Sequence, residues 1–331
     1  MKARTLGCVL LGFCLGFIPV GCGSPDRNPR SDRARALKIA VIPKGMTREF
    51  WKSIHAGAAL AAKELEVEIL WDGPLKDNDP AQQTSVVERA IDRRVDGIVL
   101  APLDATALLR PLRIAAKKKI PVVVIDSALP ERDYVSFVAT DNYLGGVLAA
   151  RRMGEVLRGR GRIFLVRCLE GSRSTSERER GFLETIEMEY PRLELRVRDR
   201  HAGSTEDSAY RLAMNLLEQF RDVEGIFCPN ESTTSGTLRA LQETDSAGRI
   251  KLVGFDSSPR LIQALGEGKV SGLVLQNPVK MGYLGVTEAV HFLRGQTVPA
   301  RVDTGAYLAT RENMDTPEIK VLLSPDLSIL D

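Results

Sequence analysis

Seven polar and aromatic side chains near the ends of predicted strands are the residues of this sequence best suited to recognise a small ligand. A carboxylate accepts two hydroxyl donors at once, an amide both donates and accepts, and a guanidinium forks onto neighbouring oxygens. An aromatic face covers the apolar C–H side of a sugar ring. The set comprises Phe50, Trp51, Asp126, Arg178, Asn230, Asp256 and Gln276. Together they predict a binding site for a polyhydroxylated molecule.

Each of these residues taken singly also has a purely structural interpretation. Asp126 and Asn230 follow predicted strands, where turn and N-cap residues of these types are common. Phe50 and Trp51 are equally typical of a hydrophobic core. The prediction of a site therefore depends on the whole set, because all seven residues fall at one edge of two predicted sheets.

The reactive residues of the sequence do not form a catalytic pattern. His55, His201 and His291 lie far apart without metal-ligand spacing, and we expect His201 at the rim of the ligand site. The sequence contains neither a G-x-S-x-G motif nor a phosphate-binding loop of the P-loop form. We therefore expect a protein that is not an enzyme, with no catalytic residue, no cofactor and no metal.

The elements that position the seven residues follow an alternating pattern from residue 37 onward. Short β-branched runs alternate with segments of helical period, which is typical of βαβ units and parallel sheets. We predict strands at 38–42, 67–70, 97–100, 122–125, 162–167, 194–198, 225–227, 251–254 and 271–275, and helices at 50–65, 82–93, 105–118, 143–157, 177–188 and 204–220. The fold class is α/β, with two doubly wound parallel-sheet lobes. In such sheets ligands lie outside the carboxyl ends of the strands.

The composition is that of an ordinary globular protein. The 331 residues are 44% hydrophobic and 27% charged, and the formal charge is +3, or +1 if Lys2 and Arg4 are removed with a leader. A charge this close to zero does not favour nucleic acid as a partner.

The first 21 residues resemble an export signal. Lys2 and Arg4 precede an apolar stretch at 6–20 that is short for a membrane span. Residues 19–22 (PVGC) resemble a bacterial lipobox, which implies diacylation, palmitate included, of Cys22 and attachment to a bacterial membrane facing the periplasm or the cell surface. Because Pro19 replaces the usual Leu, simple cleavage or a retained anchor stays open.

Residues 22–36 read as a flexible tether, since Pro, Gly, Ser and charges occur there without an apolar period. Two cysteines then remain in the exported body. Cys168 and Cys228 each follow a predicted strand, and they are either buried small hydrophobes or a disulfide.

Residues 37 to about 313 resemble the type I periplasmic binding proteins of the ribose-binding kind. The first half carries this resemblance in residues 49–53 (EFWKS), 95–98 (VDGI), 101–104 (APLD) and 120–123 (IPVV). The second half adds 140–142 (TDN), 178–182 (RERGF), 225–231 (GIFCPNE), 253–256 (VGFD) and 276–278 (QNP), in the order of the family.

The resemblance implies a hinged protein that closes on a small sugar or polyol and delivers it to the permease of an ABC importer. Phe50 and Trp51 would sandwich the sugar ring, and Asp126 would accept its hydroxyls. The remaining four residues of the set would close from the second lobe and the hinge. The family pattern implies a monomer.

Three departures from the ribose binders put ribose itself in doubt. Ala101 replaces an Asn, Ser127 replaces an Arg, and Ser204 replaces an aromatic residue. We interpret Arg48, beside the aromatic pair, as an exposed lid residue; the alternative is that it supplies a replacement charge.

The resemblance also implies three crossovers between discontinuous lobes, near 140–141, 276–277 and 300–303. The N-terminal lobe would comprise residues 37–139 and 277–299. The C-terminal lobe would comprise residues 140–276 and 300–323, with residues 324–331 as a tail.

Two alternative functions would involve a different partner, either a membrane receptor or kinase, or DNA. A sensor would present the same closed form to a membrane receptor or kinase instead of a permease. A DNA-binding regulator would need a helix-turn-helix before residue 37, where the leader and the tether stand.

Overall fold

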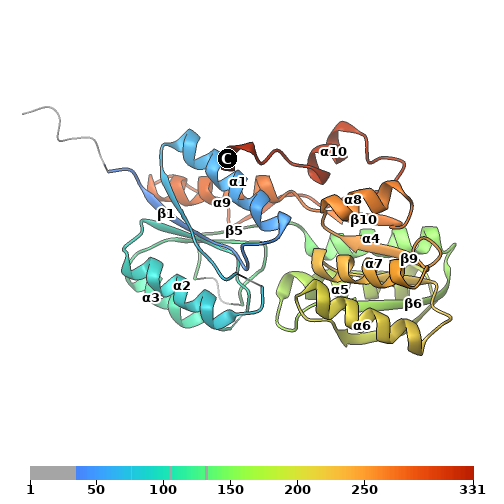
Figure 1. Cartoon of the computed structure of the whole chain (residues 1–331). Helices are drawn as coiled ribbons and strands as arrows, with labels where there is room; N and C mark the ends of the chain where they lie inside the picture. Colours follow the sequence, from blue (N-terminus) through green and yellow to red (C-terminus); the bar gives the residue numbers. More distant parts are fainter. Residues whose placement is uncertain (1–34, 76, 105, 131–132) are drawn as a thin grey trace, which may run out of the picture. The chain divides into compact units, whose positions relative to one another are not determined.

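The computed structural model describes residues 35–331 except 76, 105, 131 and 132. The predicted signal segment, Cys22 and the tether as far as residue 34 lie outside the described residues. From Ala36 onward the chain forms one unit. Two six-stranded sheets make up this unit, and helices cover both faces of each sheet (Figure 1).

The first sheet forms the N-terminal lobe and has the strand order β11-β5-β4-β3-β1-β2, all parallel. Its strands are β1 (Lys38–Ile42), β2 (Glu68–Trp71), β3 (Gly97–Leu100), β4 (Val122–Ile125), β5 (Ser136–Ala139) and β11 (Arg301–Asp303). β3 and β4 are buried along their whole length. Uniform burial explains their continuous β-branched sequences, because a parallel sheet is covered on both faces.

Helices α1 (Glu49–Leu65) and α9 (Pro278–Leu293) cover one face of this sheet, and α2 (Pro80–Asp92) and α3 (Leu109–Lys117) cover the other. α1 and α9 approach closely because each has a glycine at the contact. A Cβ on Gly57 would lie 1.9 Å from the Val279 carbonyl oxygen, and one on Gly282 would lie 2.0 Å from that of Ile54. The contact thus explains why residues 57 and 282 are glycines.

The second sheet forms the C-terminal lobe, with the strand order β12-β10-β9-β8-β6-β7. Its strands are β6 (Arg160–Arg167), β7 (Arg192–His201), β8 (Gly225–Phe227), β9 (Lys251–Phe255), β10 (Gly272–Leu275) and β12 (Tyr307–Ala309). Only β12 runs antiparallel within this described sheet.

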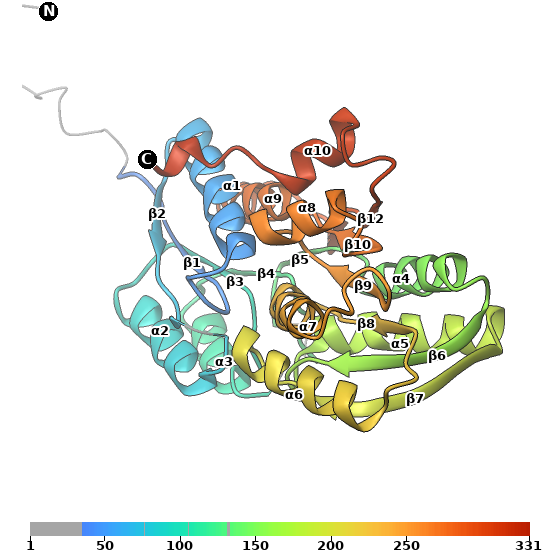
Figure 2. The same cartoon turned by 45° about the vertical axis from the view of Figure 1, so that its right-hand side comes forward.

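Helices α4 (Asn142–Val156) and α5 (Arg173–Glu189) pack on one face of the second sheet. Helices α6 (Glu206–Gln219), α7 (Glu231–Glu243), α8 (Pro259–Gly266) and α10 (Pro317–Leu323) pack on the other face (Figure 2). The predicted α/β class with two doubly wound sheets is confirmed. β5, β11 and β12 were not predicted from the sequence.

The chain passes between the two sheets at three places. The first lies between β5 and α4 and the second between β10 and α9, at the residues expected from the sequence. The third prediction was wrong. β11 pairs with β5, so residues 301–303 belong to the N-terminal lobe and the crossover lies between β11 and β12.

The C-terminal segment contacts both lobes. α10 contributes Ile319, Leu322 and Leu323 to the core of the C-terminal lobe. The chain then runs back to the N-terminal lobe, where the short 3-10 helix η1 (Ser328–Leu330) contacts α1 (Figure 2). Residues 324–330 are therefore a fourth link between the lobes.

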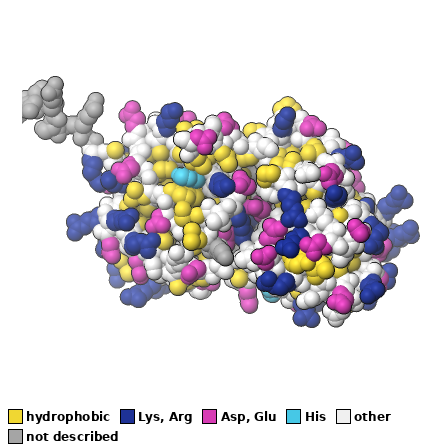
Figure 3. Space-filling view, viewed as in Figure 1, with side chains coloured by type: hydrophobic (Ala, Val, Ile, Leu, Met, Phe, Trp, Pro, Cys, Tyr) yellow, Lys and Arg dark blue, Asp and Glu magenta, His cyan; other side chains and the backbone are white. Residues whose placement is uncertain are grey.

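Cys168 and Cys228 are free and buried. Burial raises the pKa of the Cys228 thiol to about 12, as expected for an unreactive core cysteine. Of the helices in the described part of the chain, none is long and apolar enough to cross a bilayer. On the face viewed in Figure 3, basic and acidic side chains are interspersed.

Candidate functional site

All seven residues of the predicted set line one cavity between the carboxyl ends of the two sheets. Asp126, Asp256 and Gln276 each follow a strand directly, namely β4, β9 and β10. The cavity has a volume of about 50 Å³. Hydrogen bonds join the two lobes across this cavity, so the structure represents a closed arrangement.

Phe50 and Trp51 lie in the first turn of α1 and differ in burial. Trp51 is only 3% exposed and belongs to the core of the N-terminal lobe, while Phe50 packs against that core and is half-buried. Their rings meet edge to face, with centroids 4.9 Å apart. The indole Nε1 of Trp51 donates a hydrogen bond to Asp77 at 3.0 Å. Trp51 is thus both a core residue and a cavity residue.

Asp126 is paired with a lysine that the sequence analysis did not single out. Lys44, two residues after β1, is 6% exposed, and its Nζ lies 2.6 Å from Asp126 Oδ2. The same ammonium donates to Ser127 Oγ at 2.6 Å and to Ser174 Oγ at 3.2 Å. Ser174 belongs to the C-terminal lobe, so Lys44 bridges the two lobes.

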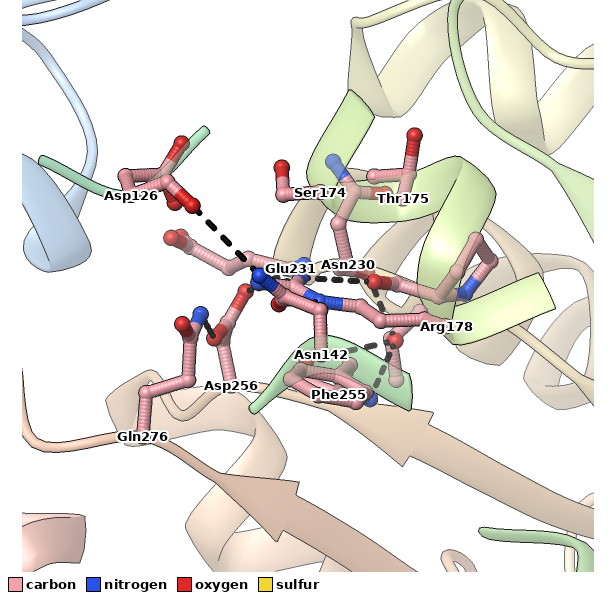
Figure 4. Close-up of polar contacts among 12 residues, drawn as sticks. Asp126, Asn142, Ser174, Thr175, Arg178, Asn230, Glu231, Phe255, Asp256 and Gln276 are labelled. Carbon is pink, nitrogen blue, oxygen red and sulfur yellow. Dashed lines mark hydrogen bonds and ion pairs between the residues drawn. The ribbon is translucent and has the colours of Figure 1, made fainter. Parts of the chain in front are cut away.

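Arg178 lies in the sixth position of α5, which begins one turn earlier than predicted, and its guanidinium is held by the C-terminal lobe alone. Nε donates to Asn142 Oδ1 at 2.8 Å, and Nη1 donates to the Pro229 carbonyl at 2.9 Å. The group stacks 3.9 Å above the ring of Phe255 (Figure 4). Arg178 is therefore held in place before any ligand arrives.

Asp256 and Gln276 form a hydrogen-bonded pair in the same lobe. Gln276 Nε2 donates to Asp256 Oδ1 at 2.7 Å, and the Glu231 backbone N–H donates to Oδ2 at 3.2 Å. Burial raises the pKa of Asp256, and the nearby guanidinium of Arg178 and the Gln276 hydrogen bond counteract this effect. The Gln276 Oε1 atom is buried without a partner among the described residues. It is an acceptor available to a ligand donor.

Asn230 has the structural role that its position also suggested. It is the N-cap of α7, and its Oδ1 accepts hydrogen bonds from the backbone and hydroxyl of Thr233 at 3.2 and 2.6 Å. Its Nδ2 donates to Ser232 Oγ at 3.1 Å. Asn230 lines the cavity, but its amide is already engaged in capping.

Two aspartates at equivalent places have the same unusual backbone. Asp126 has φ of 62° and Asp256 has φ of 66°. The left-handed region costs a residue with a Cβ roughly 1–2 kcal/mol. In both sheets this conformation turns the carboxylate at the strand end toward the cavity.

The interpretation of Arg48 as an exposed lid residue was wrong. Its side chain is 18% exposed, and Nη1 lies 3.2 Å from Asp77 Oδ2. Nη2 donates to the carbonyl of Ser204 across the cavity. Arg48 thus contacts Ser204, as Lys44 contacts Ser127. His201, by contrast, is exposed at the end of β7 and is not among the residues lining the cavity.

Among the cavity residues that sequence reasoning missed are Lys44, Asp77, Ser174 and Glu231. Lys44 offered a signal, because it follows a buried strand as Asp126 does. Glu231 follows Asn230 directly and is the first residue of α7, where an acidic residue is common because it complements the helix dipole, so its type alone gives no signal of a site.

Comparison with known proteins places this fold and cavity in a family. A model described as a periplasmic binding protein domain matches residues 39–297. The chain belongs to this family. All seven residues of the cavity set lie inside the matched range.

Relatives of this periplasmic binding protein include the ribose import binding protein of Haemophilus influenzae, 26% identical over 80% of this chain and 88% of the relative. The xylitol-binding protein of Mycolicibacterium smegmatis is 25% identical over 94% of this chain and 86% of the relative. A solute-binding protein of Agrobacterium radiobacter in complex with D-arabinose has a TM-score of 0.84 at 31% identity, covering 88% of this chain and 99% of its own. One from Agrobacterium vitis with bound D-fucose has a TM-score of 0.83 at 32% identity, covering 87% of this chain and 100% of its own.

Proposed function

We propose that this periplasmic binding protein captures a small sugar or polyol between its lobes and delivers it to an ABC-type importer. The observation that carries the proposal is the convergence of the seven predicted residues on one cavity at the carboxyl ends of both sheets. The relatives support the same function. Two of them are named for ribose import and for xylitol binding. Two solved structures contain bound D-arabinose and D-fucose.

Within this proposal the residues have distinct roles. Phe50 and Trp51 pack against the sugar ring, and Asp126 and the free Oε1 of Gln276 accept hydroxyl hydrogens. Arg178 contacts ligand oxygens with the part of its guanidinium that Asn142 and Pro229 leave free. Asp256 holds Gln276 in place, and Asn230 shapes the cavity wall as the cap of α7.

The ligand is tested by a thermal-shift screen of the purified protein against pentoses, hexoses, deoxy sugars, acidic sugars and polyols. A ligand that binds only the folded protein raises its melting temperature by mass action. We expect at least one neutral sugar or polyol to do so. If the folded protein responds to none of them, sugar capture is wrong.

Delivery and attachment are tested separately. We propose that Cys22 is the lipidated residue and that the protein works as a monomer at the membrane. Cys22→Ser should release the protein from the membrane fraction, whereas Cys14→Ser should not.

Delivery is tested with the reconstituted ABC importer. Addition of the protein with its sugar should stimulate ATP hydrolysis by this importer. A receptor or kinase that responds instead would favour the sensor function.

A further inference from the structure

Glu231 is a half-buried acidic residue of the cavity that the proposed roles do not use. It is the first residue of α7 and lines the cavity beside Asp256 (Figure 4). Its Oε2 atom is buried and has no hydrogen-bond partner among the described residues. A buried carboxylate oxygen without a hydrogen-bond partner is costly, so a proton or a ligand group must compensate it.

The other three carboxylates of the cavity each have a basic neighbour. Asp126 lies 2.6 Å from Lys44 Nζ, Asp77 lies 3.2 Å from Arg48 Nη1, and Asp256 lies 3.9 Å from Arg178 Nη1. Within the described cavity lining these three pairs use every lysine and arginine. Glu231 is the carboxylate left over.

Closure of the lobes creates the surroundings of Glu231. The charged groups that act on it are Arg48, Asp77 and Glu49 from the N-terminal lobe and Asp256 from its own lobe. Arg48 reaches the Ser204 carbonyl of the C-terminal lobe, which ties the two sides together around this carboxyl group. When the lobes separate, the carboxyl group of Glu231 becomes more exposed to water.

We propose that Glu231 couples ligand capture to protonation, so that its carboxyl group takes up one proton from solvent when the lobes close over a neutral ligand. The proton returns to solvent on opening. This inference rests on the proposed capture of a neutral ligand by closure, and it makes Glu231 a specificity-determining residue. A ligand that carries its own cation to this position would bind without proton uptake.

The direction of the pH dependence follows from the two states. Burial raises the pKa of Glu231 to about 8 in the closed form, with Asp256 and Asp77 adding to the effect and Arg48 opposing it. In the open form the pKa returns toward the usual carboxyl value. Closure is therefore favoured at low pH, and the advantage is lost as the pH rises toward about 8. Affinity should fall by up to about tenfold per pH unit in this window.

A variant locked in the closed form tests the proposal without any ligand. The hydroxyl oxygens of Ser127 and Ser174 face each other from opposite lobes at 2.9 Å, so the pair Ser127→Cys and Ser174→Cys can be oxidised to link the lobes. Mass spectrometry verifies the new disulfide. In carbon-13 spectra the Glu231 carboxyl signal, assigned by its loss in Glu231→Gln, should titrate near pH 8. An ordinary carboxyl titration in the locked form would overturn the proposal.

Calorimetry tests the same coupling with D-arabinose and D-fucose as probes. Titrations at pH 7 in two buffers of different ionisation enthalpy give the number of protons taken up, which should be close to one for the parent protein. Glu231→Gln should take up none and should show a flat pH profile. Glu218→Gln, an exposed carboxylate on α6, should behave as the parent.

The two experiments separate this inference from the proposed function. Proton uptake that persists in Glu231→Gln, or a parent protein that takes up none, overturns the inference while sugar binding stands. If no sugar binds at any pH, the proposed function fails, and the locked variant still decides whether closure protonates Glu231.

Discussion

The two lobes present an aspartate to the cavity at equivalent strand ends, but they neutralise it differently. Asp126 of the N-terminal lobe is paired with Lys44, a long side chain from the β1–α1 loop that also reaches Ser174 of the other lobe. Asp256 of the C-terminal lobe is hydrogen-bonded to Gln276, with Arg178 3.9 Å away.

The difference indicates that the cavity residues of the C-terminal lobe are held rigidly, while those of the N-terminal lobe can rearrange. The partners of Arg178, namely Asn142, Pro229, Phe255 and Asp256, all belong to the C-terminal lobe. Its arrangement can therefore survive opening. Lys44 and Arg48 make contacts across the cavity that opening breaks. We infer that the C-terminal lobe is preorganised for the ligand, while the N-terminal lobe exchanges its own contacts for ligand contacts.

The largest expected effect is a loss of folding stability when the buried Arg178 of the C-terminal lobe is removed. Arg178→Met removes a buried cation and leaves Asp256 without its nearby positive charge, so the free energy of unfolding should fall by about 3–5 kcal/mol. Lys44→Met should cost less than half as much, because opening can return Asp126 to water. Urea denaturation measures both values. If both variants lost the same free energy of unfolding, the pair of Lys44 and Asp126 would contribute as much to stability as the contacts of Arg178.

Trp51 and Phe50 extend the comparison within one lobe. Trp51→Ala should lower the free energy of unfolding by about 3–5 kcal/mol, because the side chain belongs to the core, and should also weaken sugar binding. Phe50→Ala should mainly weaken binding, because the ring is half-buried at the cavity. Thermal unfolding and calorimetry on the two variants check this. A larger loss of stability for Phe50→Ala would reverse the assignment.

Asp126 should matter more for affinity than for stability. Asp126→Ala removes a hydroxyl acceptor and leaves Lys44 without its carboxylate partner, so sugar affinity should fall at least tenfold, or about 1.4 kcal/mol. Asp199→Ala, an exposed aspartate on β7, is the matched control and should bind as the parent. Unchanged affinity in Asp126→Ala would remove this residue from the site.

The smallest expected effect concerns the C-terminal link between the lobes. Deleting residues 324–331 leaves α10 in its core but removes η1 from α1. The hinge should then open more easily, and bound sugar should dissociate a few-fold faster in stopped-flow experiments. The single variant Ser328→Ala keeps the segment and should release sugar at the parent rate. An unchanged rate after truncation would show that the link does not restrain opening.

The parts of the fold that could be predicted from the sequence are those with a strong local pattern. Strands 38–42, 97–100, 122–125 and 225–227 begin and end where predicted, because buried parallel strands are continuous apolar runs between helical segments. β11 has the sequence Arg-Val-Asp with one apolar residue, so its place in the N-terminal lobe could not be predicted, and the third crossover was placed too early.

The sequence by itself determined the α/β class, the two lobes and seven residues that line one cavity, because the period of the apolar residues fixes the elements and parallel strands share one carboxyl edge. Only the tertiary structure decided how these residues are paired. Lys44 contacts Asp126 and Arg48 contacts Ser204, because long side chains reach residues remote in sequence only after the lobes have formed and closed. Closure also leaves the buried Oε2 of Glu231 without a hydrogen-bond partner among the described residues.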